Sequence, residues 1–215
     1  MIFLRYESFR GYLRAYPVTS VIIALNLVYF IVTAVTGDIN DGYHLVQTGA
    51  FVSFMPDNPY GLDEPWRLVT SMFMHSSMQH IFFNMFSILV FAPPLEKLLK
   101  PVKYAVFYLL CGIIANLLTG AVHGLFGNEQ TIYLSTGASG AIYGVFGAFL
   151  YIALFRKAWL DPGSRKTVYI ILAFGLVYSL ITPSVSLLGH VGGGVAGFLL
   201  YGLLDRAMTK KRRMY

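Results

Sequence analysis

Long apolar stretches separated by short polar connections make up most of this sequence. The pattern divides the chain into six such stretches, at residues 18–36, 68–91, 104–122, 138–155, 167–182 and 188–204. Their lengths suit the hydrocarbon core of a bilayer, which about 20 residues of α-helix cross. None of the six contains Asp, Glu, Lys or Arg. The pattern therefore predicts an all-α polytopic membrane protein with six transmembrane helices, organised as a single membrane domain over residues 1–215.

The connection between the first two predicted spans is much longer than a turn. Residues 37–67 are rich in Gly, Asp, Asn and Pro, and they carry five acidic residues against one basic residue. Connections of this length usually have a structure of their own, and residues 45–55 are too apolar to be simply solvated. Trp66 and Tyr60 carry rings of the kind that favours the membrane interface. We expect a structured loop that lies partly in the interface.

Composition supports a membrane location and excludes several kinds of site and function. Of the 215 residues, 56% are hydrophobic and only 12% are charged, and these values exclude an ordinary soluble domain. Cys111 is the single cysteine, so neither an intrachain disulfide nor a cysteine metal site is possible. The uncharged spans argue against an ion-coupled transporter, because such proteins normally place ionisable groups at mid-membrane.

The net charge of +6 reflects membrane topology. Fifteen of the sixteen Lys and Arg residues fall in the termini and in alternate connections, and only Arg67 falls on the other side. The positive-inside rule then places both termini in the cytoplasm. Because the basic residues form no single patch, membrane lipid is the expected partner and nucleic acid is not. No signal peptide precedes the first span, so we expect a multi-pass protein of the cell membrane, in a bacterial cytoplasmic membrane.

A serine with glycines on either side opens the fourth predicted span. Residues 135–147 read STGASGAIYGVFG, which places Ser139 inside the bilayer near one end of the span. Small residues line helix contacts in membranes, and by itself the motif favours such a packing role. The alternative is a nucleophile, which needs a base within hydrogen-bond reach. The choice depends on whether a histidine from another helix can reach this serine.

Three polar side chains from different predicted helices share one depth. Ser139, His190 and His80 lie 17, 16 and 17 residues from the basic residues that mark the cytoplasmic ends of their spans. At about 1.5 Å per residue, all three lie roughly 24 to 26 Å above the inner boundary. Asn84 follows His80 by one turn and shares its helix face. A histidine can also simply tie helices together, and His75 is expected near the outer surface, where water satisfies it.

Glycines would let the fourth and sixth helices approach each other closely. The small-residue spacings are formed by Gly140, Gly144 and Gly147 in one span and by Gly192, Gly193, Gly194 and Gly197 in the other. Close approach is what a short serine side chain needs to reach an imidazole. Tyr143 shares a face with Ser139 and could lean on His190, although ordinary aromatic packing explains its position equally well.

These residues together permit acyl transfer. His190 would take the proton of the Ser139 hydroxyl as it attacks a carbonyl, and would then return it to the leaving amine. The oxyanion would be stabilised by His80, Asn84 and the backbone N–H of Ser139 at a helix N-terminus. A metal site is not expected because the spans contain neither an HExxH motif nor a carboxylate, and no cofactor is expected.

These motifs resemble those of the rhomboid intramembrane serine proteases. The GASG of residues 137–140 is similar to the GxSG of that family, with Ser139 as nucleophile between Gly137 and Gly140. GHVGGGVAG resembles the sixth-helix motif that carries the base, here His190, and Tyr143 matches the tyrosine that packs on it. The further matching residues are His80 and Asn84 in HSSMQHIFFN, with Trp66 and Arg67 at the end of the first loop, residues 37–67.

The resemblance implies a six-helix bundle in which a short fourth helix begins at the serine, inside a water-accessible cavity. It implies a serine endopeptidase, a hydrolase that cleaves single-pass transmembrane protein substrates near the outer leaflet with a Ser-His dyad and an oxyanion hole. Two other classes stay open. One is a rhomboid-like protein that binds membrane clients without cutting them, and the other is a small channel or transporter.

Overall fold

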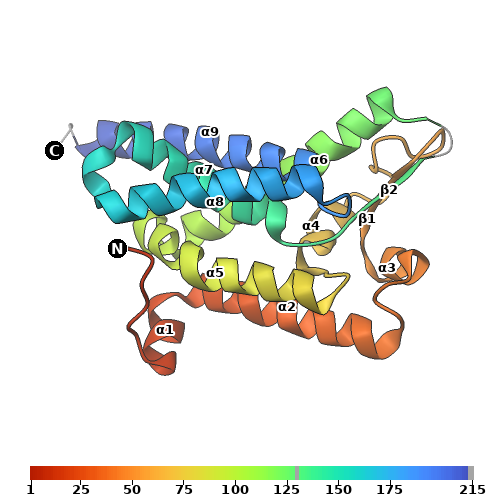
Figure 1. Ribbon diagram of the computed structural model, residues 1–215, viewed down its shortest axis with the longest axis horizontal. Coiled ribbons are helices and arrows are strands. Elements are labelled where there is room, and N and C mark those ends of the chain that lie inside the picture. Colours follow the sequence, from red (N-terminus) through yellow and green to blue (C-terminus); the bar gives the residue numbers. More distant parts are fainter. Residues whose placement is uncertain (129–130, 213–215) are drawn as a thin grey trace.

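The computed structural model describes residues 1–128 and 131–212, and helices dominate it (Figure 1). The helices are α1 Phe9–Ala15, α2 Pro17–Thr36, α3 Gly42–Thr48, α4 Arg67–Thr70, η1 Ser71–Phe73, α5 Met78–Leu99, α6 Pro101–Phe126, α7 Ser139–Phe155, η2 Lys157–Trp159, α8 Pro162–Ile181 and α9 Leu187–Arg212. Two strands, β1 Phe51–Phe54 and β2 Ile132–Ser135, complete the described elements.

Within the described part of the chain, five helices are long and apolar enough to cross a membrane, namely α2, α5, α6, α8 and α9. One further apolar helix, α7, forms the fourth predicted span, has only 17 residues and lies at the centre of the molecule. It contacts α5, α6, α8 and α9, and most of its side chains are buried. The long helices therefore surround a short one, and Figure 1 shows α7 between them.

A small antiparallel sheet interrupts the otherwise helical fold. Strand β1 pairs with β2 so that Phe51 faces Ser135 and Phe54 faces Ile132. Aromatic and β-branched residues in both segments favour strands. The all-α prediction is therefore incomplete at this point. The predicted loop 37–67 is indeed structured, since α3 and β1 lie within it, and Asp41 caps α3 by accepting hydrogen bonds from the first turn.

The predicted second span, residues 68–91, does not form one helix. Residues 67–73 form the short helices α4 and η1, and α5 begins only at Met78. The Ser77 hydroxyl accepts a hydrogen bond from the N–H of His80 and so caps α5. At its other end α5 continues through Pro93 and Pro94 to Leu99. Hydrophobicity alone could not reveal this break because the residues on both sides of it are apolar.

Buried carboxylates occur just beyond the predicted spans, where the helices are longer than expected. Glu96 of α5 is 1% exposed and accepts hydrogen bonds from the N–H groups of Val18 and Thr19 at the start of α2. Asp205 of α9 forms an ion pair with Arg156 at 2.8 Å. These contacts join helix ends at one end of the bundle. In Figure 1 the first residues and the end of α9 lie at that end, opposite α3 and the sheet.

Candidate active site

Ser139 is the first residue of α7, and the residues before it explain why the helix begins there. Gly137 has φ +117°, a left-handed conformation that favours glycine. Its N–H donates a hydrogen bond of 2.8 Å to the carbonyl of Ser71. A Cβ at this position would lie 2.6 Å from Nε2 of His80. Gly137 therefore turns the chain into α7 and also leaves room for the His80 ring.

His190 lies in the first turn of α9 and is buried, with 6% of its surface exposed. The ring of Tyr143 stacks on it with a centroid distance of 3.9 Å and an interplanar angle of 11°. Tyr143 follows Ser139 by one helical turn, so both lie on the face of α7 that meets α9. The structure thus places the face of α7 that carries Ser139 against His190. The Tyr143 ring packs on the imidazole and fixes its orientation.

Glycine contacts set the distance between these two helices. A Cβ built on Gly193 of α9 would lie 1.9 Å from the carbonyl oxygen of Gly140, and one on Gly197 would lie 1.9 Å from that of Gly144. Such separations leave no room for any side chain. Backbone therefore touches backbone along this contact, as the small-residue spacing predicted.

The side chain of Ser139 is half-buried. Among the described residues its hydroxyl forms no hydrogen bond, whereas Nδ1 of His190 lies 2.6 Å from the hydroxyl oxygen of Ser179 in α8. A bond between nucleophile and base often tightens only when substrate binds. Nδ1 of His190 is therefore engaged, and among the described residues Nε2 is the ring nitrogen that has no hydrogen-bond partner.

Sequence reasoning missed Ser179, although a signal for it exists. It is the single serine of the predicted span 167–182. Counted from Lys166 at about 1.5 Å per residue, it lies roughly 20 Å above the inner boundary, close to the level of the other polar residues. The depth argument that groups Ser139 with His80 and His190 therefore also applies to Ser179.

The residues expected to stabilise an oxyanion lie on α5, close to the turn before α7. His80 is half-buried and its ring lies beside Gly137. Asn84 is buried, and its Nδ2 donates a hydrogen bond of 3.0 Å to the carbonyl of His80. One of the two amide hydrogens of Asn84 remains for another acceptor.

The expectation for His75 was wrong. The side chain is fully buried rather than in contact with water, and its ring meets that of His80 edge-on at 4.8 Å. The cause is the break before α5, which folds residues 74–77 inward. Burial, with a smaller contribution from His80, lowers the pKa of His75 from 6.5 to about 3. The His75 ring is therefore neutral at physiological pH.

Trp66 and Arg67 lie in the first loop and organise it. Arg67 is 6% exposed and donates hydrogen bonds to the carbonyls of Val46 and Ala50, and it forms an ion pair with Glu64 at 2.8 Å. The guanidinium lies 4.4 Å from the ring centre of Trp66. These contacts tie α3 and β1 to α4, so the pair supports the loop's structure.

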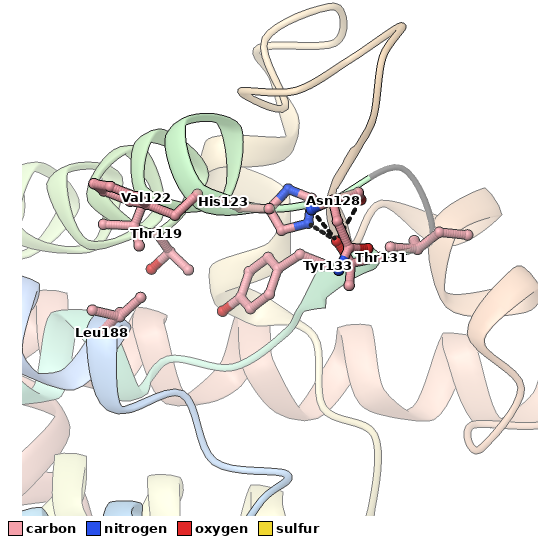
Figure 2. A pocket seen from close by; sticks show the side chains of 10 residues that line it. Thr119, Val122, His123, Asn128, Thr131, Tyr133 and Leu188 are labelled. Atoms are coloured by element: carbon pink, nitrogen blue, oxygen red, sulfur yellow. Dashed lines mark hydrogen bonds between the residues drawn. The ribbon is translucent and has the colours of Figure 1, made fainter.

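A pocket of about 390 Å³ lies between the end of α6, β2 and the start of α9 (Figure 2). Its walls include Thr119, Tyr133 and Leu188, and His123 is hydrogen-bonded to Thr131 beside it. None of the residues predicted for catalysis lines it. Within the described part of the chain, no group of three or more His, Cys, Asp or Glu residues could hold a metal ion.

Comparison with known proteins decides the family. The family model of the Rhomboid domain matches residues 62–207, which is well over half of the chain. A protein of Bacillus subtilis (strain 168), the candidate rhomboid protease YdcA, is 33% identical over 222 residues that cover both chains completely. The chain belongs to the rhomboid family.

More distant relatives of this rhomboid carry similar names. The rhomboid protease GluP of Bacillus subtilis is 27% identical over 180 residues, which span 84% of this chain and 33% of GluP. The rhomboid-like protease 1 of Toxoplasma gondii is 26% identical over 209 residues, covering 93% and 69% of the two chains. This rhomboid is therefore an enzyme of the intramembrane serine protease class, a hydrolase with apolar helices that suit a multi-pass membrane protein.

Proposed function

We propose that this rhomboid cleaves peptide bonds of transmembrane proteins with a dyad of Ser139 and His190. One observation carries the proposal: His190 is stacked on Tyr143, one turn from Ser139, where glycine contacts hold α7 against α9. A buried imidazole held in this way is oriented without a carboxylate. Since a polar ring inside a membrane is costly unless it has a use, its place beside a helix-terminal serine favours catalysis over packing.

The mechanism follows from the roles of the two side chains. Nε2 of His190 removes the proton of the Ser139 hydroxyl while the oxygen attacks the scissile carbonyl. The protonated imidazole then gives this proton to the leaving amine, which releases one product and leaves an acyl-enzyme. A water molecule, deprotonated by His190 in turn, hydrolyses the ester and restores Ser139.

Charge on the carbonyl oxygen is stabilised by donors at the start of α7. The N–H of Ser139 belongs to the first turn, whose N–H groups have no partner within the helix. We assign His80 and the free amide hydrogen of Asn84 as the side-chain donors, with Gly137 and Gly140 shaping the turn around them. Preorganised donors of this kind typically contribute about 3 kcal/mol of transition-state stabilisation each.

The proposed substrates are single-pass transmembrane proteins cut near the outer leaflet. Ser139 begins α7, the shortest of the described apolar helices named as spans, and its depth of roughly 24 to 26 Å, counted from the sequence, supports a cut within the outward half of the bilayer. The same proposal counts α7 as one of six spans, the fourth in chain order, in a single domain over residues 1–215 with both termini in the cytoplasm. Fifteen basic residues on one side support this orientation, and we place the protein in a bacterial cytoplasmic membrane.

A reporter-cleavage assay tests the dyad. The protein, reconstituted in liposomes, should cut a single-pass transmembrane reporter, and mass spectrometry of the products locates the scissile bond. Ser139→Ala should reduce the rate by about a thousandfold or more, because the nucleophile is removed. Ser87→Ala, a change at a half-buried serine of α5, serves as the matched control and should leave the rate unchanged.

Fluorophosphonate labelling separates cleavage from client binding without cutting. An activated serine reacts with such a probe, so the wild-type protein should be labelled and Ser139→Ala should not. Full cleavage by Ser139→Ala, or equal labelling of both proteins, would contradict the proposed dyad.

A further inference from the structure

Helix α8 places a hydroxyl against the back of the His190 ring. The oxygen of Ser179 lies 2.6 Å from Nδ1 of His190, and both residues are buried, with 5% and 6% of their surfaces exposed. The contact joins two helices, α8 and α9. Of the residues of α8, only Ser164, Val168 and Ser179 are buried, so Ser179 is the place in the second half of the helix where it enters the core.

The hydrogen bonds of Ser179 determine which nitrogen of His190 carries the proton. The hydroxyl donates its hydrogen to the carbonyl of Gly175, one turn earlier in α8, at 2.7 Å. A serine hydroxyl has one hydrogen and two acceptor sites, so toward His190 it acts as the acceptor. The donor is then Nδ1–H. A neutral imidazole protonated at Nδ1 has a free lone pair at Nε2, and this is the tautomer that a base acting on Ser139 requires.

The same turn of α8 also accommodates the ring that stacks on His190. A Cβ on Gly175 would lie 2.0 Å from the phenol oxygen of Tyr143, so glycine at this position leaves space for that group. Gly175 and Ser179 are four residues apart and share a helix face. One face of α8 therefore borders both Tyr143 and Nδ1 of His190.

We infer that Ser179 is a positioning residue for the proposed dyad, and that it holds His190 in the Nδ1–H tautomer with Nε2 directed to the nucleophile. This inference rests on the proposed function. A neutral hydroxyl takes the position that a carboxylate occupies in a Ser-His-Asp triad, without burying a negative charge inside the membrane. Ser179 acts through His190 and not on the reacting atoms, and its hydroxyl also interacts with the phenol of Tyr143, whose ring stacks on the same imidazole.

A purely structural role for Ser179 predicts different behaviour. Serine hydroxyls in helices often bond the carbonyl four residues earlier, and this bond by itself explains nothing about catalysis. Ser20 of α2 provides the comparison, since its hydroxyl donates to the carbonyl of Tyr16 at 2.7 Å and contacts no histidine. Ser20→Ala therefore removes the same kind of local bond and leaves the imidazole untouched.

The first measurement compares kcat and KM of the wild type, Ser20→Ala and Ser179→Ala on the transmembrane reporter. We expect Ser179→Ala to lower kcat by about tenfold, the scale of one lost hydrogen bond to the base, with KM changed less than about twofold. Ser20→Ala should match the wild type in both constants. A kcat of Ser179→Ala equal to that of the wild type would overturn the inference.

The second measurement reads the tautomer directly and does not need cleavage. Nitrogen NMR of the ¹⁵N-histidine-labelled protein at alkaline pH, with the His190 signals identified by their absence in His190→Asn, shows which ring nitrogen is protonated. The wild type should show Nδ1–H, and Ser179→Ala should show a mixture of both tautomers. A loss of kcat with the Nδ1–H form retained would mean that Ser179 acts only on the fold, and would overturn the inference. If Ser139→Ala cleaves like the wild type, the proposed dyad fails, while the tautomer result stands by itself.

Discussion

Three histidines near the start of α7 differ because their surroundings differ. His190 has a stacked ring on one side and a hydroxyl at Nδ1, which together define its orientation. His80 lies beside Gly137, where a side chain would collide with it. His75 is the most deeply buried of the three, and it contacts the protein's interior rather than water. At the scale of single residues, the same ring thus serves as a proposed base, a proposed donor and a neutral core group.

The stability contribution of His75 should depend on pH. Its pKa is about 3 in the folded protein and about 6.5 when unfolded, so the unfolded state binds more protons between these values. Stability is therefore complete above about pH 6.5 and falls as the pH is lowered toward 3, by up to about 1.4 kcal/mol per pH unit. His75→Gln should show a shallower decrease of thermal unfolding midpoint between neutral and acidic pH in detergent. Equal slopes for the two proteins would contradict this explanation.

At the scale of helices, the contact between α7 and α9 depends on individual glycines rather than on glycine content. Gly193 and Gly194 are neighbours in α9 but face different surroundings. A Cβ at 193 would meet the backbone carbonyl of Gly140 at 1.9 Å, whereas one at 194 would meet its nearest atom at 3.8 Å. Backbone cannot move aside as a flexible side chain can. Of these two positions, only residue 193 therefore needs to be glycine for the contact between α7 and α9.

Gly193→Ala should separate α7 from α9 and weaken the protein. Overpacking of this kind costs about 1–3 kcal/mol, and it should also reduce reporter cleavage because His190 moves relative to Ser139. Gly194→Ala is the matched control, and it should keep or slightly raise stability because alanine favours helix. Thermal unfolding and cleavage rate of the two variants test this. A similar loss of thermal stability and cleavage rate in both variants would contradict this explanation, because the geometry leaves room for a methyl group at residue 194 and none at residue 193.

At the scale of the whole molecule, the two ends of the bundle have different chemistry. One end holds α3, the sheet and Arg67, which bonds backbone carbonyls of the first loop. The other holds the buried Glu96 at the start of α2 and the Arg156–Asp205 pair. The second end also carries most basic residues, and it is the end that we place in the cytoplasm. Of the terminal basic residues counted in that argument, Arg213 lies outside the described residues.

Cysteine labelling tests this orientation. In a Cys111→Ala background, Leu62→Cys places a thiol in the exposed first loop and Ala158→Cys places one in the exposed connection after α7. In intact cells a membrane-impermeant maleimide should label Leu62→Cys and not Ala158→Cys, and both should be labelled after lysis. The reverse pattern would place the termini outside.

The apolar stretches, the excess of basic residues in alternate connections and the motifs that resemble rhomboids follow from the amino-acid order alone, because hydrophobic length and charge add up along the chain. The sequence also placed Ser139, His190 and His80 at one depth, although their catalytic roles stay predictions. Which side chains meet depends on the packing of the helices in three dimensions. The Ser179 contact, the burial of His75 and the pairing of β1 with β2 depend on how each helix is rotated and how the loops fold back, and residues far apart in the chain set these jointly.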